Sequence, residues 1–509
     1  MIRNDSVIYA KGFGLANLEN KIASTPQTVY YMCSVSKQFA GYAIVLLARQ
    51  GKLKLDDDIH LYLPWMARFG KPITIRNLLN HTSGLRDDLN MINISGTPDG
   101  AMITQDYALK LLKNQRTLNF EPGEKYQYSN SNFVLLAEIV RVASGQSFRA
   151  FTDEQIVKPL GMTSTRFVDD GQELIANRAP SYQASVDNTY KNSLHNVYTL
   201  GDGGLFTNLD DMTRWIMNFY APRAGDARDI EQLTERGKLT NGKQINYALG
   251  ISVDEARGWK RYMHNGSLAG YRTIIAVYPE LKMGFVVFGN GGDNEVYSKS
   301  DQLAALFVPE KGTSPAPKPA VVLDSALQVL KQPQAIQELT GTYIAEDGYQ
   351  LKFSLKDGKF WMNNRVLVQT TADSFYVFVN PAIRFGFHRG NRSTLPYLEL
   401  MSPAVDKPLR MEMVADPLVL TEQALKSYTG NYYSPELDCT YTITLKDGQL
   451  FLGNFRRGEG KITVLGGDHL VTNLWPMQHL KLRRDAKNRV IGFEVNTGGF
   501  MHLVFNKMD

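Results

Sequence analysis

The sequence predicts a mixed α/β region followed by two small antiparallel β-barrels. Helix-like apolar segments mix with short strands as far as Gln302, a proline-rich stretch follows, and the remaining residues alternate apolar and polar side chains with a period of two. The length of 509 residues suits about three domains. With 43% hydrophobic and 21% charged residues, the chain has the composition of a folded protein.

The amino terminus is expected to form a hairpin with an unusually short first arm. Residues 7–10 are typical of a strand, and Asn4 and Asp5 before them suit a turn, so only residues 1–3 remain as the partner. An arm of three residues is short for a strand, which indicates that a preceding strand is missing. A frayed edge strand with a polar turn is the alternative.

The first region, residues 1–310, contains two helices and a strand pair that matter later. Residues 38–50 suit a buried helix closed by Gly51, and residues 133–143 form a second helix-like run. Residues 273–278 and 283–288 favour two antiparallel strands joined by a turn.

Residues 311–333 are predicted to be a linker. The stretch at its start, residues 311–319, is too rich in proline and small residues to form a helix or a central strand. Two barrels then follow, at residues 334–418 and 419–509. The segments 340–343 and 355–358 match 429–432 and 445–448 at offsets of 89 and 90, each copy with about eight short strand candidates.

Charge and composition exclude several classes of function. The net charge is +5 and the basic clusters are short, so no nucleic-acid partner is expected. The longest apolar stretch has ten residues, too few for a transmembrane segment. Cys33 and Cys439 indicate neither a disulfide framework nor a thiolate site, and no metal-ligand spacing or cofactor fingerprint is present. We expect no metal and no cofactor.

Ser34 and Lys37 form the first of three motifs that carry chemistry. Three residues apart on a helix, they share one face, so the lysine can reach the serine hydroxyl. A lysine desolvated against an apolar helix can have its pKa lowered enough to take the serine proton. The alternative, an N-cap serine beside a surface lysine, is common enough that this motif alone decides little.

The second motif is Tyr128 with Asn130, and the third is His264 with Gly266. A phenol can relay protons, an amide can donate and accept, and the histidine precedes the predicted strand pair, where it could meet a substrate carboxylate. Each motif also has a counterpart of the same spacing elsewhere, at residues 190–192 and 388–390.

The order of these motifs resembles the serine β-lactamase and penicillin-binding-protein superfamily. The most similar branch contains class C β-lactamases, D-alanyl-D-alanine carboxypeptidases and D-aminopeptidases. Supporting phrases lie at residues 12–14, 16–17, 34–38, 78–85, 160–162 and 203–205, so the resemblance covers about residues 6 to 305. It implies an α+β domain with an antiparallel sheet flanked by helices and a helical lobe, followed by two lipocalin-like barrels.

The family's first helix and strand are missing here, so we expect a longer natural protein with an export signal. Residues 1–6 hold no signal peptide.

The resemblance implies a reaction through a covalent acyl-enzyme. Ser34 would be the nucleophile, Lys37 its general base or proton relay, and Tyr128 the acid for the leaving group. Asn130, His264 and Gly266 would bind substrate. The backbone amides of Ser34 and Ser267 would form the oxyanion hole.

His81 and Cys33 are expected to have structural and not catalytic roles. His81 could be an alternative base, but a ring that hydrogen-bonds a turn is favoured. Cys33 beside Ser34 is expected to be a buried packing residue rather than a rival nucleophile.

The histidine of the third motif is the main departure, because penicillin-recognising enzymes of the family carry lysine there. A neutral histidine attracts a carboxylate less, which favours D-amino-acid amides, D-peptides or small esters as substrates. A D-alanyl-D-alanine carboxypeptidase or a weak β-lactamase is the alternative within the same chemistry. A non-catalytic ligand- or partner-binding protein with a decayed hydrolase domain is the alternative from another class. The physiological substrate, the oligomeric state, the localisation and the role of the barrels stay open.

Overall fold

The computed structural model describes residues 1–98, 100–185, 189–292, 295–312, 333–378, 380–390, 396–402, 408–414, 418–497 and 499–508. Two compact units divide the chain, one of residues 1–92 and 98–314 and the other of residues 93–97 and 315–509. The predicted linker, residues 311–333, lies almost entirely outside the described residues. Among the described residues, no helix has the length and apolar character needed to cross a bilayer.

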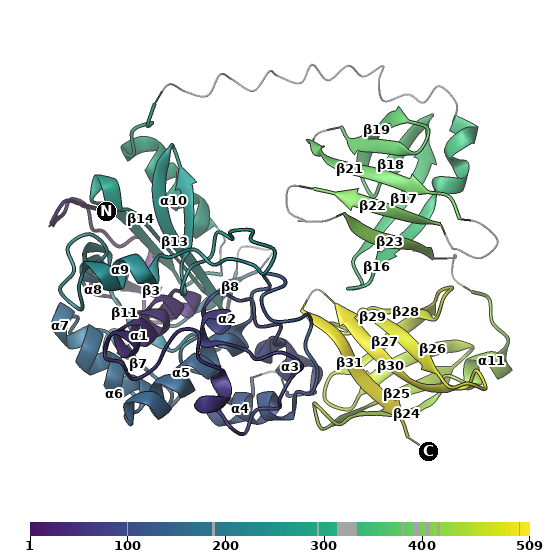
Figure 1. The fold of residues 1–509 in the computed structure, drawn as a ribbon, viewed down its shortest axis with the longest axis horizontal. Coiled ribbons are helices and arrows are strands. Elements are labelled where there is room, and N and C mark those ends of the chain that lie inside the picture. The colour runs from purple at the N-terminus through teal and green to yellow at the C-terminus, as the bar shows by residue number, and fades with distance from the viewer. Residues whose placement is uncertain are drawn as a thin grey trace. The chain divides into compact units, whose positions relative to one another are not determined.

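The first unit is built on a six-stranded antiparallel sheet (Figure 1). The strand order is β12 (Ser252–Ala256), β13 (Trp259–Leu268), β14 (Tyr271–Tyr278), β15 (Met283–Gly289), β1 (Ile2–Arg3) and β2 (Ser6–Val7). The predicted strand pair is therefore confirmed as β14 and β15. The predicted amino-terminal hairpin is also present, with Ile2 opposite Val7, and its first arm pairs with β15. Its second strand is Ser6–Val7, and not residues 7–10 as predicted.

Helices supply most of the remaining structure of this unit. They are α1 (Lys37–Arg49), α2 (Ile75–Leu79), α3 (Asp88–Ile94, whose last two residues belong to the second unit), α4 (Gln105–Asn114), α5 (Asn130–Ser144), α6 (Phe148–Thr152), α7 (Lys158–Leu160), α8 (Leu209–Asn218), α9 (Ala227–Leu233) and α10 (Glu295–Phe307). Short strand pairs connect them: β3 (Leu15–Asn17) with β4 (Ile22–Ala23), β6 (Ile103–Thr104) with β10 (Val197–Tyr198), β8 (Tyr182–Ala184) with β9 (Tyr190–Asn192), and β11 (Leu205–Thr207) with β5 (Tyr30–Tyr31) and β7 (Arg166–Phe167).

Helix α1 is the centre of the core. Its residues from Lys37 to Leu47 are buried, and it packs against α5, α6 and α9. Trp215 of α8 is fully buried, stacks on Phe39 with ring centroids 4.2 Å apart, and donates its indole N–H to Gln38. Burying an aromatic side chain of this size contributes a few kcal/mol, so this contact helps to fix α1.

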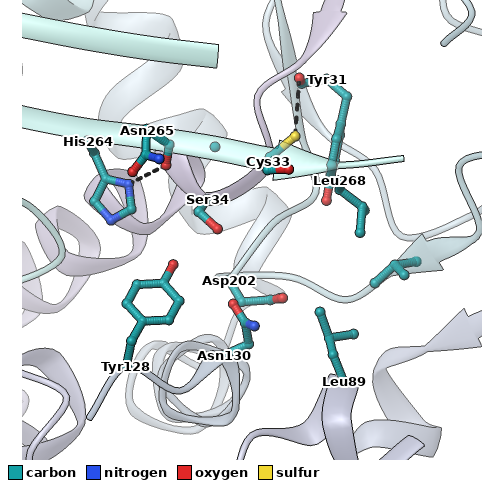
Figure 2. A pocket seen from close by; sticks show the side chains of 13 residues that line it. Tyr31, Cys33, Ser34, Leu89, Tyr128, Asn130, Asp202, His264, Asn265 and Leu268 are labelled. Atoms are coloured by element: carbon teal, nitrogen blue, oxygen red, sulfur yellow. Dashed lines mark hydrogen bonds between the residues drawn. The ribbon is translucent and has the colours of Figure 1, made fainter. Parts of the chain in front are cut away.

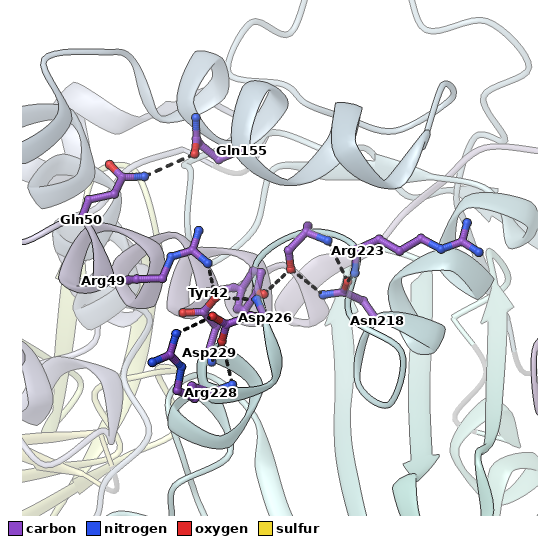
Figure 3. A network of polar contacts seen from close by, with 10 residues as sticks. Tyr42, Arg49, Gln50, Gln155, Asn218, Arg223, Asp226, Arg228 and Asp229 are labelled. Carbon is purple, nitrogen blue, oxygen red and sulfur yellow. Dashed lines mark hydrogen bonds and ion pairs between the residues drawn. The ribbon is translucent and has the colours of Figure 1, made fainter.

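A polar network fixes the carboxy-terminal end of α1 (Figure 3). The Arg49 guanidinium forms an ion pair of 2.7 Å with Asp229 of α9, and the same carboxylate accepts the backbone N–H of Asp226. The Tyr42 hydroxyl donates to the carbonyl of Ala224 in the loop before α9. Gln38 near the start of α1 and Arg49 at its end thus both contact neighbouring helices. These contacts fix the position of the helix and of its first turn.

The second unit contains two closed eight-stranded barrels. The strands of the first are β16 (Gly341–Ala345), β17 (Gln350–Lys356), β18 (Lys359–Met362), β19 (Arg365–Thr371), β20 (Ser374–Val377), β21 (Asn380–His388), β22 (Tyr397–Met401) and β23 (Leu409–Val414). Those of the second are β24 (Gly430–Ser434), β25 (Cys439–Lys446), β26 (Gln449–Asn454), β27 (Gly458–Val464), β28 (His469–Thr472), β29 (His479–Arg484), β30 (Val490–Thr497) and β31 (Phe500–Lys507), with α11 (Glu422–Lys426) before them.

The internal repeat has a structural basis in matching hairpin turns. Asp357 and Gly358 join β17 to β18 with φ of 52° and 67°, and Asp447 and Gly448 join β25 to β26 with φ of 49° and 73°. Positive φ at both positions is the two-residue turn that Asp-Gly favours. Buried side chains including Phe353, Phe360 and Phe387 fill the first barrel, as in many small barrels.

We predict that Trp215→Ala lowers the free energy of unfolding of the α/β unit by about 3 to 5 kcal/mol, because it leaves a cavity beside α1. Urea unfolding followed by the helix signal in circular dichroism measures this. Phe13→Ala is the control within the same unit, since that ring is 71% exposed and its loss should cost under about 0.5 kcal/mol. Equal effects of the two variants would contradict the prediction.

Candidate active site

Ser34 lies in a 3₁₀ turn, Cys33–Ser36, that leads from β5 into α1. The turn replaces the α-helical start that the sequence suggested, because Cys33 has a φ of +50°, a left-handed conformation that residues other than glycine seldom adopt. Cys33 Sγ lies 3.8 and 3.9 Å from the carbonyl oxygens of Tyr31 and Tyr271. The residue is buried, as expected of a packing residue, and burial raises the pKa of its thiol far above the usual value.

Lys37 is fully buried, and its amine makes three polar contacts. Nζ lies 3.2 Å from Ser34 Oγ, 2.8 Å from Asn130 Oδ1 and 2.9 Å from the carbonyl oxygen of Asp202. The amide oxygen and the carbonyl can only accept, so each takes an N–H of the lysine. The third position faces Ser34, where the proton can lie on either the nitrogen or the oxygen.

Burial lowers the pKa of Lys37 from 10.5 to about 8, against smaller opposing effects of Asp202, Asp87 and Asp88. Desolvation disfavours the ammonium form, since few solvent dipoles remain to stabilise it. A substantial fraction of the lysine is therefore neutral in mildly alkaline solution and can accept a proton from Ser34.

Asn130 is the first residue of α5, three residues earlier than the predicted helical run. Its side-chain oxygen accepts from Lys37, and its Nδ2 donates to Asp87 Oδ2 at 2.9 Å. The backbone N–H of Asn130 donates to the same carboxylate oxygen at 2.7 Å. Asp87 thus holds Asn130 in the orientation that presents its oxygen to Lys37, and Nδ2 keeps a second N–H for another acceptor.

The Tyr128 ring covers the lysine amine from the cavity side. Lys37 Nζ lies 4.9 Å from the ring centroid, and Figure 2 shows the Tyr128 and Ser34 hydroxyls facing the same space. Desolvation raises the pKa of the Tyr128 phenol well above its usual value, and a hydrogen bond with Ser34 lowers it in part. The phenol therefore stays protonated near neutral pH and is a proton donor.

His264 lies on β13 and is 4% exposed. Its Nδ1 lies 2.7 Å from the carbonyl oxygen of Asn265, and its Nε2 lies 2.8 Å from the Tyr247 hydroxyl. A carbonyl only accepts, so Nδ1 must carry the proton and Nε2 accepts from the tyrosine. Burial, and secondarily the Lys37 charge, lower the pKa of His264 to about 3, which keeps the ring neutral.

Gly266 lets β13 approach the turn that carries Ser34. A Cβ at this position would lie 2.5 Å from the carbonyl oxygen of Met32 and 2.8 Å from Cys33 Cβ, closer than atoms can pack. The Tyr297 hydroxyl donates to the carbonyl of Gly266 at 3.0 Å. Ser267 follows on the same strand, so its backbone lies beside the cavity.

These groups meet at one cavity of about 370 Å³ (Figure 2). Among the residues that line it are Ser34, Tyr128, Asn130, His264, Gly266 and Ser267. The structure therefore brings together all the site residues suggested by the sequence, with Lys37 buried next to Ser34. It places the two counterparts elsewhere: Tyr190–Asn192 is exposed in β9, and His388 is 42% exposed on the first barrel.

His81 is buried next to Tyr128, with ring centroids 4.3 Å apart. Its Nδ1 accepts the backbone N–H of Ser129 at 3.2 Å and contacts Asn132 Nδ2 at 3.1 Å. Burial lowers the pKa of His81 well below its usual value. The ring hydrogen-bonds the turn before α5, in agreement with the favoured interpretation.

Sequence reasoning missed Asp87, Asp202 and Tyr247, each of which contacts a site residue. Asp202 directly precedes Gly203 and Gly204, which belong to one of the phrases that carry the resemblance, whereas Asp202 itself does not. Asp87 follows another such phrase, residues 78–85. Nothing near Tyr247 in the sequence connects it with His264.

Comparisons with known proteins agree with this architecture. The family model described as Beta-lactamase matches residues 1–308. A D-aminopeptidase of Gluconobacter oxydans (strain 621H) is 28% identical over 337 residues, covering 64% of this chain and 62% of that protein. A D-aminopeptidase of Brucella anthropi is 29% identical over 273 residues, covering 53% and 51%. The match thus spans less than two thirds of either relative.

One solved structure, an octameric penicillin-binding protein homologue from Pyrococcus abyssi, covers 94% of each chain with a TM-score of 0.54 and 21% identity. At this identity the likeness shows the fold alone. It extends over nearly the whole chain.

We predict that the rate at which a neutral fluorophosphonate phosphonylates Ser34, with loss of fluoride, rises about tenfold per pH unit below pH 8 and levels off above it. The reason is that only neutral Lys37, whose pKa is about 8, can accept the serine proton. Stopped-time mass spectrometry over a pH series measures the rate. His264, with a pKa of about 3, should add no step between pH 5 and 7. A midpoint near 6.5 or 10 would contradict this account.

We predict that Asp87→Asn lowers kcat/KM for p-nitrophenyl acetate about 10- to 100-fold. Two hydrogen bonds from Asn130 would lose their charged acceptor, and such bonds contribute about 1.5 to 3 kcal/mol. Asp106→Asn, at an exposed position in α4, makes the same change of charge and should leave kcat/KM unaltered. A loss of less than threefold in Asp87→Asn would show that Asn130 is held by other contacts.

Proposed function

The chain belongs to the beta-lactamase family, and on that premise we propose that it is a serine hydrolase that works through a covalent acyl-enzyme on Ser34. One observation carries the proposal. The buried amine of Lys37 lies 3.2 Å from the Ser34 hydroxyl, while its two other contacts are groups that can only accept. A neutral lysine held in this way has its lone pair facing the serine proton.

The proposed reaction begins when Lys37 takes the proton of Ser34 and Oγ bonds to the substrate carbonyl carbon. The carbonyl oxygen becomes an oxyanion, held by the backbone N–H groups of Ser34 and Ser267. Tyr128 then gives its proton to the leaving amine or alkoxide as the carbonyl–leaving-group bond breaks. The Lys37 ammonium returns a proton to Tyr128, and water hydrolyses the acyl ester in a second cycle.

Asn130 and His264 have supporting roles in this proposal. Asn130 keeps Lys37 in place through its oxygen and offers its remaining N–H to the substrate amide. His264 and Gly266 form a neutral wall beside the nucleophile.

We propose D-amino-acid amides, D-peptides or small esters as the substrate class. Relatives named D-aminopeptidase support the choice, and so does His264, because a neutral ring with both nitrogens engaged offers no cation to a carboxylate. Carboxypeptidase substrates and penicillins carry that carboxylate, so these activities rank lower. A decayed, non-catalytic domain ranks lowest, since the hydrogen bonds of Lys37 and Asn130 are intact.

Intact-protein mass spectrometry after exposure to a fluorophosphonate and, separately, to a penicillin tests the proposal. We predict one fluorophosphonate adduct on the wild type and on Cys33→Ala, no adduct on Ser34→Ala, and penicillin labelling at least 100-fold slower. Folding of each variant is checked by circular dichroism. An unlabelled wild type would refute the proposed nucleophile, and equally fast penicillin labelling would favour a penicillin-recognising enzyme.

A further inference from the structure

The side chains that line the cavity include an acidic group but no basic one of fixed charge. Of the described residues that line the cavity, Asp202 is the only one with a carboxylate, and none is a lysine or an arginine. His264 is held neutral, and Lys37 is fully buried with all three of its contacts made to the protein. A ligand in this cavity therefore meets a negative group and no exposed positive one.

Asp202 is held in place by its own backbone. It lies in the Gly201–Gly204 segment between β10 and β11, and Lys37 Nζ donates to its carbonyl oxygen at 2.9 Å. Gly201 has a φ of +90°, and a Cβ there would lie 2.2 Å from the carbonyl oxygen of Phe133. The segment is therefore tightly packed against α5, and the side chain of Asp202 has little freedom to move away.

The Asp202 carboxylate lacks a full set of partners. The residue is 5% exposed, and its Oδ1 makes no hydrogen bond within the described part of the chain. Burial raises the pKa of Asp202, while the charge of Lys37 and the Thr199 side chain lower it. A buried acceptor without a donor is costly, so a cationic donor entering the cavity would be favoured there. Figure 2 shows this carboxylate facing the cavity between Asn130 and Leu89.

We propose that Asp202 binds the free ammonium group of the substrate and thereby selects α-amino amides and esters over N-acylated or carboxylate-bearing ones. The inference rests on the proposed function, which it deepens by naming the group that recognises the amine. A charge-assisted hydrogen bond to a carboxylate that is 5% exposed is stronger than a neutral one. The remaining lining includes Leu89, Val197 and Leu268, which leave the amine no competing anion.

Binding without turnover tests the inference separately from catalysis. In the Ser34→Ala background, calorimetry compares D-alaninamide with propionamide, which lacks only the amino group, and with N-acetyl-D-alaninamide. We expect D-alaninamide to bind at least tenfold more tightly than either. The preference should disappear in Ser34→Ala/Asp202→Asn and persist in Ser34→Ala/Asp106→Asn. Equal binding of the three amides to Ser34→Ala would overturn the inference even if Asp202→Asn failed to fold.

Kinetics separate substrate binding by Asp202 from an indirect effect through Lys37. With Asp202→Asn we expect kcat/KM for D-alanine p-nitroanilide to fall at least 30-fold, mainly through KM. The value for propionyl p-nitroanilide should fall far less. The pH midpoint should move below 8 with both substrates, because the charge of Asp202 raises the pKa of Lys37. Equal losses of kcat/KM on both substrates would show that Asp202 acts only through Lys37. Failure of the fluorophosphonate to label Ser34 would instead refute the proposed function and leave the binding comparison decisive for Asp202.

Discussion

The buried amine of Lys37 is the constraint on which the site depends. A charged ammonium is costly to remove from water, and burial brings the pKa of Lys37 down to about 8. The amine is retained because two acceptors from distant parts of the chain, Asn130 Oδ1 and the Asp202 carbonyl, take two of its N–H groups. The remaining direction is toward Ser34. Burial and geometry together turn an ordinary cation into a base directed at one hydroxyl.

The fold brings four segments together around that amine. Packing of α1 against α5 places Lys37 beside Asn130, and the glycine-rich turn at Asp202 closes over α5. Strand β13 approaches the Ser34 turn only because Gly266 has no side chain. Tyr247 and Asp87 fix His264 and Asn130, respectively, so the groups around Ser34 have settled orientations. A wall that is neutral at His264 and negative at Asp202 then favours cationic over anionic substrates.

Local patterns predicted both barrels, through period-two alternation and the internal repeat. The spacing of Ser34 with Lys37 and of Tyr128 with Asn130 suggested two parts of the site, and the resemblance to the superfamily then singled out five of its side chains. The contacts of Asp87, Asp202 and Tyr247 were not predictable, because they join residues 43, 165 and 17 positions from their partners. Such contacts depend on packing of the whole unit.

The most direct test of the central claim is the ionisation of Lys37 itself. Nuclear magnetic resonance of protein labelled with carbon-13 at lysine Cε follows each amine through a pH titration, and Lys37→Arg identifies the resonance. We predict one lysine that titrates near pH 8 and is absent from the variant. A Lys37 resonance that titrates near 10.4, the value of a solvated lysine, would contradict the account, since the amine would then be a cation unable to accept the serine proton.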